Sequence, residues 1–187
     1  SRADVLVMTR CDQVSNPELK RIEEDLQKYC LSPRTLIAKT VHQPVALVDS
    51  RGVRRPLTDL SNHRLLLFAG IGNPNAFFQK IQQMGSQVAG TRSFPDHYHY
   101  QREDIQSLRA WVDEHRMNAA EPNLKPWLVV TTRKDLVKLD VWQLSGVDVV
   151  AMEVELQFLS GEGEFEKLVE SVALLADRPT NNPTGSE

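Results

Sequence analysis

The fold is decided by the stretch Leu65-Leu66-Leu67-Phe68-Ala69-Gly70-Ile71-Gly72-Asn73-Pro74. Residues 65–69 form an unbroken apolar run, which is typical of a parallel strand covered by helices on both faces. The two glycines permit a tight turn, Asn73 is a good N-cap, and Pro74 suits the first position of a helix. The stretch therefore predicts a buried strand followed at once by a helix.

The same order of strands and helices continues on both sides of this stretch. Apolar spacing predicts helices over 17–30, 74–84, 103–116 and 164–176, and further buried strands over 3–8, 86–92 and 127–130. We therefore predict an α/β fold whose central part, residues 62–149, is a Rossmann-like three-layer domain with a parallel sheet.

Three other segments have strand character. Residues 35–41 predict one strand, and 44–49 and 53–57 predict the arms of a hairpin around Ser50-Arg51-Gly52. Residues 151–158 alternate strictly, which predicts an antiparallel, half-exposed strand whose apolar face carries Met152, Val154, Leu156 and Phe158.

Composition narrows the classes of function. The chain has 187 residues and a net charge of -3, so it lacks the basic footprint of a nucleic-acid-binding protein. Cys11 and Cys30 match neither a zinc spacing nor a disulfide framework, which favours reduced thiols and implies no metal site. No apolar run approaches the roughly 20 residues that span a bilayer. The start at Ser1, directly before a predicted strand, suggests a fragment of a longer protein.

Three loops each follow a predicted strand: residues 70–73, 94–100 and 131–135. Because parallel strands end at one edge of a sheet, we expect these loops to lie together, where open α/β folds hold ligands. Two of the loops also begin helices, whose free amides favour anions, so a phosphorylated sugar would suit this edge.

His97 is the candidate for proton transfer in these loops. A histidine can take a proton from a hydroxyl near neutral pH, or orient a carboxylate that does so. The alternative is a histidine bonded to a backbone carbonyl in a surface turn. Adjacent side chains point apart on an extended segment, so Asp96 is expected to act as a cap or turn residue.

Together, three motifs resemble a known family. They are Phe68-Ala69-Gly70-Ile71-Gly72-Asn73-Pro74 with Phe77-Phe78, Phe94-Pro95-Asp96-His97 with Tyr100, and Thr131-Thr132-Arg133-Lys134-Asp135. In this order they resemble the carboxyl-terminal half of tetraacyldisaccharide 4'-kinase, the lipid A pathway enzyme that phosphorylates a glucosamine disaccharide lipid with ATP. Thr9-Arg10-Cys11-Asp12 resembles a further, shorter stretch of that family.

The resemblance implies a division of the chain. It predicts the end of a P-loop kinase domain (1–43), hinge strands (44–61), the Rossmann-like domain (62–149), a returning hinge strand (150–159), a helix that packs on the first domain (160–178) and a disordered tail (179–187). The fold would thus combine the Rossmann-like domain with a two-stranded hinge and remnants of a P-loop NTPase domain.

The resemblance also implies roles for individual residues. His97 would work with an aspartate outside this chain to deprotonate the sugar hydroxyl that attacks ATP. Substrate-binding residues would be Asn73, Asp96, Tyr100, Thr132, Lys134 and Asp135, and Asp12 would be a cofactor-binding residue. For Lys134 and Asp135, an equally weighted alternative is a charged first helical turn.

The implied cofactors are ATP and Mg²⁺, bound mainly by an amino-terminal P-loop domain. The sequence contains no Gly-x-x-x-x-Gly-Lys-Ser/Thr loop, so this chain is expected to be inactive alone and to supply one wall of an interdomain active site. The lipid disaccharide and the membrane surface are the other implied partners, and the implied location is the cytoplasmic face of the bacterial inner membrane.

Two positions depart from the family pattern. Tyr98 stands where the family often has a second histidine, with His99 one position later, and Arg133 replaces a glutamate. The rival hypothesis is a non-catalytic Rossmann-like module that binds a phosphorylated metabolite or a protein partner.

Overall fold

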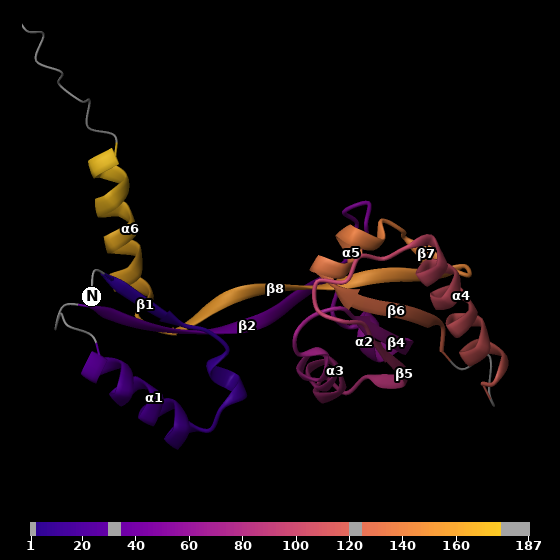
Figure 1. Cartoon of the computed structure of the whole chain (residues 1–187), viewed down its shortest axis with the longest axis horizontal. Coiled ribbons are helices and arrows are strands. Elements are labelled where there is room, and N and C mark those ends of the chain that lie inside the picture. The colour runs from indigo at the N-terminus through magenta and orange to yellow at the C-terminus, as the bar shows by residue number, and fades with distance from the viewer. Residues whose placement is uncertain (1–2, 30–34, 120–124, 177–187) are drawn as a thin grey trace, which may run out of the picture. The chain divides into compact units, whose positions relative to one another are not determined.

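The computed structural model describes residues 3–29, 35–119 and 125–176, which fall into two compact units. Unit 1 comprises Ser1–Gln43 and Leu156–Glu187, and unit 2 comprises Pro44–Glu155. Both units combine helices with strands, which confirms the predicted α/β class (Figure 1).

Unit 2 contains the elements predicted around the Leu65–Pro74 stretch. They are β4 (Arg64–Ala69), α3 (Pro74–Gln83), β5 (Gln87–Ser93), α4 (Arg102–Met117), β6 (Trp127–Thr132) and α5 (Arg133–Leu139). The side chain of Asn73 accepts a hydrogen bond from Ala76 N and Pro74 is the first helical residue, so the predicted start of α3 is confirmed. Short elements add to this set: β3 (Arg54–Arg55), α2 (Asp59–Asn62) and β7 (Gln143–Leu144).

The sheet of unit 2 is mainly parallel. Its strand order is β2 (Leu36–Val48), β8 (Val147–Ser160), β6, β4, β5, and the pairs β8–β6, β6–β4 and β4–β5 are all parallel. β4 lies between β6 and β5, and it is apolar on both faces because helices cover both (Figure 1). Leu65 and Leu67 pack in the cluster that contains α3, whereas Leu66 and Phe68 pack in the cluster that contains α4 and α5.

The chain changes direction across the sheet between β4 and β6. It leaves β4 for α3 on one face, and it leaves the neighbouring β6 for α5 on the other face. In open α/β sheets, such a switch point opens a crevice at the carboxyl ends of the two strands, where ligands bind.

β2 corrects one predicted boundary. It runs without a break from Leu36 to Val48, whereas the sequence predicted separate strands over 35–41 and 44–49. The proline at position 44 does not end the strand, because proline favours extended backbone in the residue before it. The hairpin is confirmed, since β2 and β3 pair antiparallel with Leu47 opposite Arg55.

β8 corrects a second prediction. Its residues 149–152 run parallel to β6, with Val149 opposite Val129, and the short β7 pairs with it antiparallel. On its other side β8 lies next to β2 in the sheet. Its residues 149–152 are all buried, whereas Val154 and Leu156 are 44% and 53% exposed. The start of the predicted segment, residues 151–152, is therefore fully covered instead of half-exposed, because the strand passes from a covered part of the sheet to an open one.

Unit 1 is built from the two ends of the chain. β1 (Val5–Met8) pairs parallel with β2, and α1 (Asn16–Tyr29) follows Ser15, whose hydroxyl accepts a bond from Glu18 N. α6 (Glu162–Ala176) packs Phe165 against Phe158, with ring centroids 5.4 Å apart.

The predicted apolar stripe of the last helix is largely open in this chain, since Val169 and Val172 are 51% and 60% exposed. None of the helices in the described ranges is long and apolar enough to span a bilayer. The predicted tail over 179–187, Cys30 and residues 120–124 lie outside the described residues.

Candidate functional site at the carboxyl edge of the parallel strands

The three predicted loops meet at one residue of α5. The amide of Gly70, after β4, donates to Oδ2 of Asp135 over 3.0 Å, and the hydroxyl of Tyr100, after β5, donates to its Oδ1 over 3.1 Å. Asp135 itself follows β6. The expectation that the loops lie together is therefore confirmed, and they meet at the switch point between β4 and β6.

Asp135 is fully buried and has the role of an internal connector. Besides Gly70 and Tyr100, its Oδ2 accepts a bond of 2.6 Å from the Thr132 hydroxyl, and its amide donates back to that hydroxyl over 3.2 Å. Thr132 is the N-cap of α5. A carboxylate so enclosed and so fully bonded organises the loops rather than presenting free oxygens to a bound molecule.

Tyr100 belongs to an aromatic cluster beneath the edge. The rings of Phe94 and Tyr100 are 5.0 Å apart, those of Tyr98 and Tyr100 are 5.3 Å apart, and Phe68 of β4 lies 6.0 Å from Tyr100. Burial, followed by the charge of Asp135, raises the pKa of the Tyr100 hydroxyl well above its usual range. The hydroxyl therefore stays protonated and remains a donor to Asp135.

Residues 94–101, which we call the 94–101 loop, connect β5 to α4 and are tied to α5 at alternate positions. Lys134 Nζ bonds Asp96 Oδ1 over 3.2 Å, Lys138 Nζ donates to the carbonyl of Tyr98 over 3.0 Å, and Tyr100 bonds Asp135. His97 and His99, which lie between these three positions, are exposed. The loop thus turns one set of residues inward and the two histidines outward.

The backbone at His97 is left-handed, with φ 58°. Because the loop is not extended there, the prediction that the side chains of Asp96 and His97 point apart is wrong: His97 Nε2 lies 3.9 Å from Asp96 Oδ2. Asp96 Oδ1 also accepts the His97 amide over 2.8 Å, so Asp96 does act as a turn residue. The His97 side chain is 78% exposed, so its imidazole is open to a molecule bound at this edge.

The charge beside His97 is fixed by Lys134. The hydrogen bond from Lys134, with a smaller contribution from the His97 amide, holds the pKa of the Asp96 carboxyl below its ordinary value. Asp96 is thus an ionised acceptor at neutral pH. An exposed histidine in this setting can accept a proton from a hydroxyl group.

Two further predicted site residues, Asn73 and Asp12, make none of the contacts described above among the three loops. Asn73 is exposed, but its side-chain oxygen is used to cap α3 by accepting the amide of Ala76 over 3.1 Å. Asp12 lies in unit 1, exposed, in the 3-10 turn Cys11–Gln13 after β1. Arg133, one of the two departures from the family pattern, is exposed on the first turn of α5.

Two groups at the edge were missed from the sequence. They are the Gly70 amide and Lys138. The sequence predicted only a tight turn at Gly70, with no hydrogen bond to Asp135. The spacing of Lys134 and Lys138 was a usable signal, since residues four apart lie on one face of a helix.

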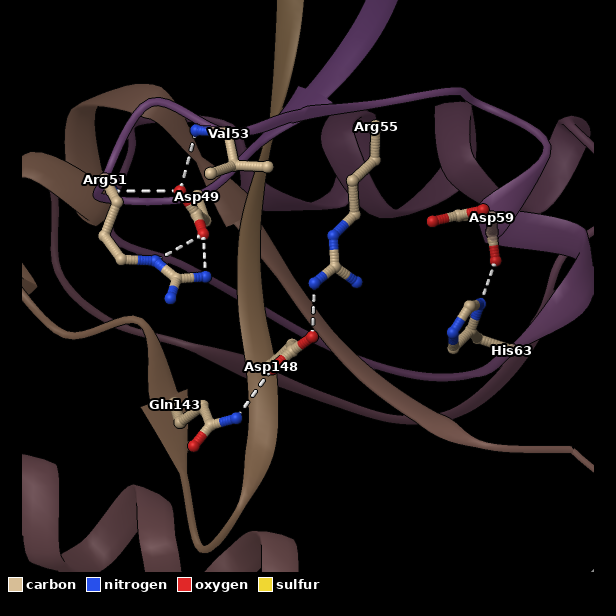
Figure 2. Close-up of polar contacts among 8 residues, drawn as sticks. All are labelled: Asp49, Arg51, Val53, Arg55, Asp59, His63, Gln143 and Asp148. Atoms are coloured by element: carbon tan, nitrogen blue, oxygen red, sulfur yellow. Dashed lines mark hydrogen bonds and ion pairs between the residues drawn. The ribbon is translucent and has the colours of Figure 1, made fainter.

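A second polar cluster lies near the amino-terminal end of β8 (Figure 2). Asp148 accepts a hydrogen bond from Arg55 and one of 2.8 Å from Gln143 Nε2. Asp49 accepts two hydrogen bonds from the Arg51 side chain and one each from the backbone amides of Arg51 and Val53. Burial opposes the ionisation of both carboxyls, but these bonds outweigh it and lower both pKa values. Within this cluster the two carboxylates are bonded by neighbouring arginine, glutamine and amide groups, so its role is structural.

Two cavities lie elsewhere. One of about 510 Å³ is lined by Arg109, Asp140, Val141, Trp142, Gln143, Ser145 and Gly146. The other, of about 280 Å³, is lined by residues that include Arg64, His115 and Trp127, near the start of β6. Neither of these two cavities includes a residue of the three loops. Within the described ranges, no three His, Cys, Asp or Glu side chains are grouped to hold a metal ion.

Comparisons with known proteins agree with the resemblance in the motifs. The family model described as tetraacyldisaccharide-1-P 4'-kinase matches residues 1–173. A tetraacyldisaccharide 4'-kinase of Desulfatibacillum aliphaticivorans is 30% identical over 91% of this chain and 43% of its own length. One from Halothermothrix orenii is 28% identical over 73% of this chain and 35% of its own length.

A solved structure shares the fold. The crystal structure of LpxK from Aquifex aeolicus in complex with ATP aligns with a TM-score of 0.53 at 20% identity, over 90% of this chain and 51% of that one. The chain thus spans about half, or less, of the length of the relatives it matches.

Proposed function

The chain belongs to the tetraacyldisaccharide-1-P 4'-kinase family, and on that premise we propose that it forms the carboxyl-terminal portion of a lipid kinase. The reaction is the ATP-dependent phosphorylation of the 4'-hydroxyl of a tetraacyldisaccharide 1-phosphate in lipid A biosynthesis. The part of the relatives that this chain does not cover would supply the phosphate loop, since none occurs in this sequence.

The observation that carries the proposal is the exposed His97 beside an ionised carboxylate at the switch point. Its imidazole is 78% exposed, 3.9 Å from Asp96, in a loop tied down by α5. In phosphoryl transfer the protein contributes chiefly by positioning and by accepting the proton of the attacking hydroxyl. ATP with Mg²⁺, when bound, supplies the phosphoryl group and neutralises its charge.

The residues of this chain divide the work as follows. His97 Nε2 takes the proton of the sugar hydroxyl, together with an aspartate outside this chain. Asp96 holds the turn at His97 by accepting its amide, and Asp96 is itself held in place by Lys134. The exposed helix start at Asn73 borders the place for the sugar, because Gly72 lies close enough to Asp96 that an added Cβ would be 3.3 Å from its Oδ2.

The location and partners follow from the same proposal. A tetraacyl lipid has to be reached in a membrane, so the complete kinase works at the cytoplasmic face of the bacterial inner membrane. The amino-terminal P-loop domain and the lipid disaccharide are its direct partners, and unit 2 contributes one wall of the active site.

The test is transfer of the γ-phosphoryl group of ATP to a tetraacyldisaccharide 1-phosphate by the complete protein encoded by the gene that carries this chain. The expected product is the 4'-phosphate. A substrate analogue that lacks the 4'-hydroxyl is the matched control and should accept no phosphoryl group. This 187-residue chain should show no transfer by itself. A complete protein that binds the disaccharide without phosphorylating it would support the rival reading, a binding module.

A further inference from the structure

We infer that α5 is the positioning element for the 94–101 loop, and that Tyr100 and Asp135 are positioning residues for His97. The inference rests on the proposed function, because it says how His97 is held ready for proton transfer. It adds two residues that act through His97 and that do not themselves touch the substrate.

The first argument is the pattern of contacts along the loop. Asp96, Tyr98 and Tyr100 each bond to a different residue of α5: Lys134, Lys138 and Asp135. These three attachments alternate with the two exposed histidines. The attachment on each side of His97 therefore restricts the left-handed turn in which it sits.

The second argument is the difference in burial between the attachments. The Lys134–Asp96 pair is at the surface, with side chains 39% and 46% exposed, so water and salt weaken it. Asp135 is fully buried, which makes its bond to Tyr100 the protected one. The buried bond is therefore the anchor that keeps the loop in register with α5.

The third argument is that Asp135 joins the loop to the ends of two strands of the sheet, β4 and β6. It holds the Gly70 amide at the end of β4 and the Thr132 hydroxyl at the end of β6. The position of the Tyr100 hydroxyl is thus set by the two strands that form the switch point. His97, three residues earlier, takes its place relative to the same two strands.

The arrangement also argues against a direct role for Tyr100 at the substrate. Its hydroxyl donates its hydrogen bond to Asp135, and its ring packs in the cluster with Phe68, Phe94 and Tyr98. Removing the hydroxyl alone would leave this aromatic packing intact and remove the buried attachment of the loop to α5.

The experiment is a double-mutant cycle in the complete protein, with Tyr100→Phe, His97→Ala and both together, measuring kcat and KM. We expect Tyr100→Phe to lower kcat by roughly 10- to 100-fold with little change in KM, the size that misplacement of a reacting group produces. In the His97→Ala background, Tyr100→Phe should cause no further loss. Equal losses in both backgrounds would overturn the inference, since Tyr100 would then act independently of His97.

Tyr98→Phe is the matched control, because it removes a hydroxyl that bonds Asp104 of α4 instead of α5. Tyr98→Phe should lower kcat by only a small part of the loss in Tyr100→Phe. An equal loss of kcat would contradict the inference that α5 positions the loop. Lys138→Met, which removes a second attachment to α5, should lower kcat in the same direction if Tyr100→Phe fails to fold. An unchanged kcat in a folded Lys138→Met protein would then count against the inference.

A second readout does not need activity. In the 187-residue chain, ¹⁵N relaxation of the His97 and His99 amides should report increased mobility in Tyr100→Phe and not in Tyr98→Phe. If the wild-type complete protein transfers no phosphoryl group, the proposed function fails, and this measurement alone decides whether α5 holds the loop. Unchanged relaxation in Tyr100→Phe would overturn the inference.

Discussion

The hydroxyl of Tyr100 donates a 3.1 Å hydrogen bond to Oδ1 of Asp135, a carboxylate that is fully buried at the junction of three strand-ending loops. This one contact links the 94–101 loop to α5 across 35 positions of sequence. Because Asp135 also holds Gly70 and Thr132, it is the residue whose loss should disturb the edge most.

Asp135→Ala should lower the free energy of unfolding of unit 2 by at least ~3 kcal/mol, because it leaves the buried Gly70 amide and the Tyr100 hydroxyl without an acceptor. All three tryptophans, Trp111, Trp127 and Trp142, lie in unit 2, so the fluorescence change in urea reports its unfolding. Asp135→Asn keeps one acceptor oxygen and should lose less. A loss in Asp135→Ala no larger than that of an ordinary surface substitution would contradict the role of connector.

Gly70→Ala should destabilise unit 2 by about 1–3 kcal/mol, because overpacking a filled site forces its neighbours to move. The added Cβ would lie 3.0 Å from Asp135 Oδ1 and 3.1 Å from the Tyr100 hydroxyl. Gly72→Ala is the matched control, since its Cβ meets only the exposed Asp96 carboxylate, at 3.3 Å. Equal unfolding midpoints for the two variants would show that the space around Gly70 is not tightly filled by Asp135 and Tyr100.

The adjacent threonines of β6 should respond differently to the same change. The Thr131 hydroxyl is buried without a hydrogen-bond partner among the described residues, so Thr131→Val should be neutral or stabilising. Thr132→Val removes the N-cap of α5 and the bond to Asp135, and should cost about 1–2 kcal/mol. Urea titrations of the two variants test this directly. A larger loss of stability in Thr131→Val than in Thr132→Val would contradict the capping role of Thr132.

The Arg55–Asp148 pair predicts a pH dependence. The pKa of Asp148 is lower in the folded chain than its ordinary value of 3.8, so its contribution to stability is complete above that pH and is lost as the pH falls below it. Asp148→Asn should therefore cost about 1–3 kcal/mol at pH 7 and progressively less below pH 3.8.

Asp140→Asn is the control for Asp148→Asn. Asp140 is exposed, with left-handed backbone that asparagine also adopts readily, so its stability should stay within about 0.5 kcal/mol of wild type. A stability difference between wild type and Asp148→Asn that does not change between pH 7 and low pH would contradict the ionised pair.

Local signals in the sequence predicted the central part of the fold. The apolar run of β4, the cap at Asn73 and the stripe of α3 each depend on neighbouring residues only, and all three are confirmed. β8 was predicted less well, because its residues 149–152 and 153–160 lie in different surroundings that no single pattern describes.

The candidate site was predictable in its location but not in its internal bonds. Parallel strands fix that their carboxyl ends share an edge, so the meeting of the three loops followed from the strands alone. The burial of Asp135 depends on Gly70 and Tyr100, which are distant in sequence, and a charged residue in a first helical turn ordinarily indicates a surface. The left-handed turn at His97 likewise depends on the contacts of the loop with α5.

The central claim is that this chain supplies His97 to phosphoryl transfer, and His99 provides the matched comparison, since both histidines are exposed in the same loop. The measurement is kcat for 4'-phosphorylation by the complete protein as wild type, His97→Ala and His99→Ala, with folding checked by tryptophan fluorescence. We predict a loss of ~10² or more for His97→Ala, a size normal for removal of a general base, and a far smaller change for His99→Ala. A folded His97→Ala protein that retains wild-type kcat would contradict the claim.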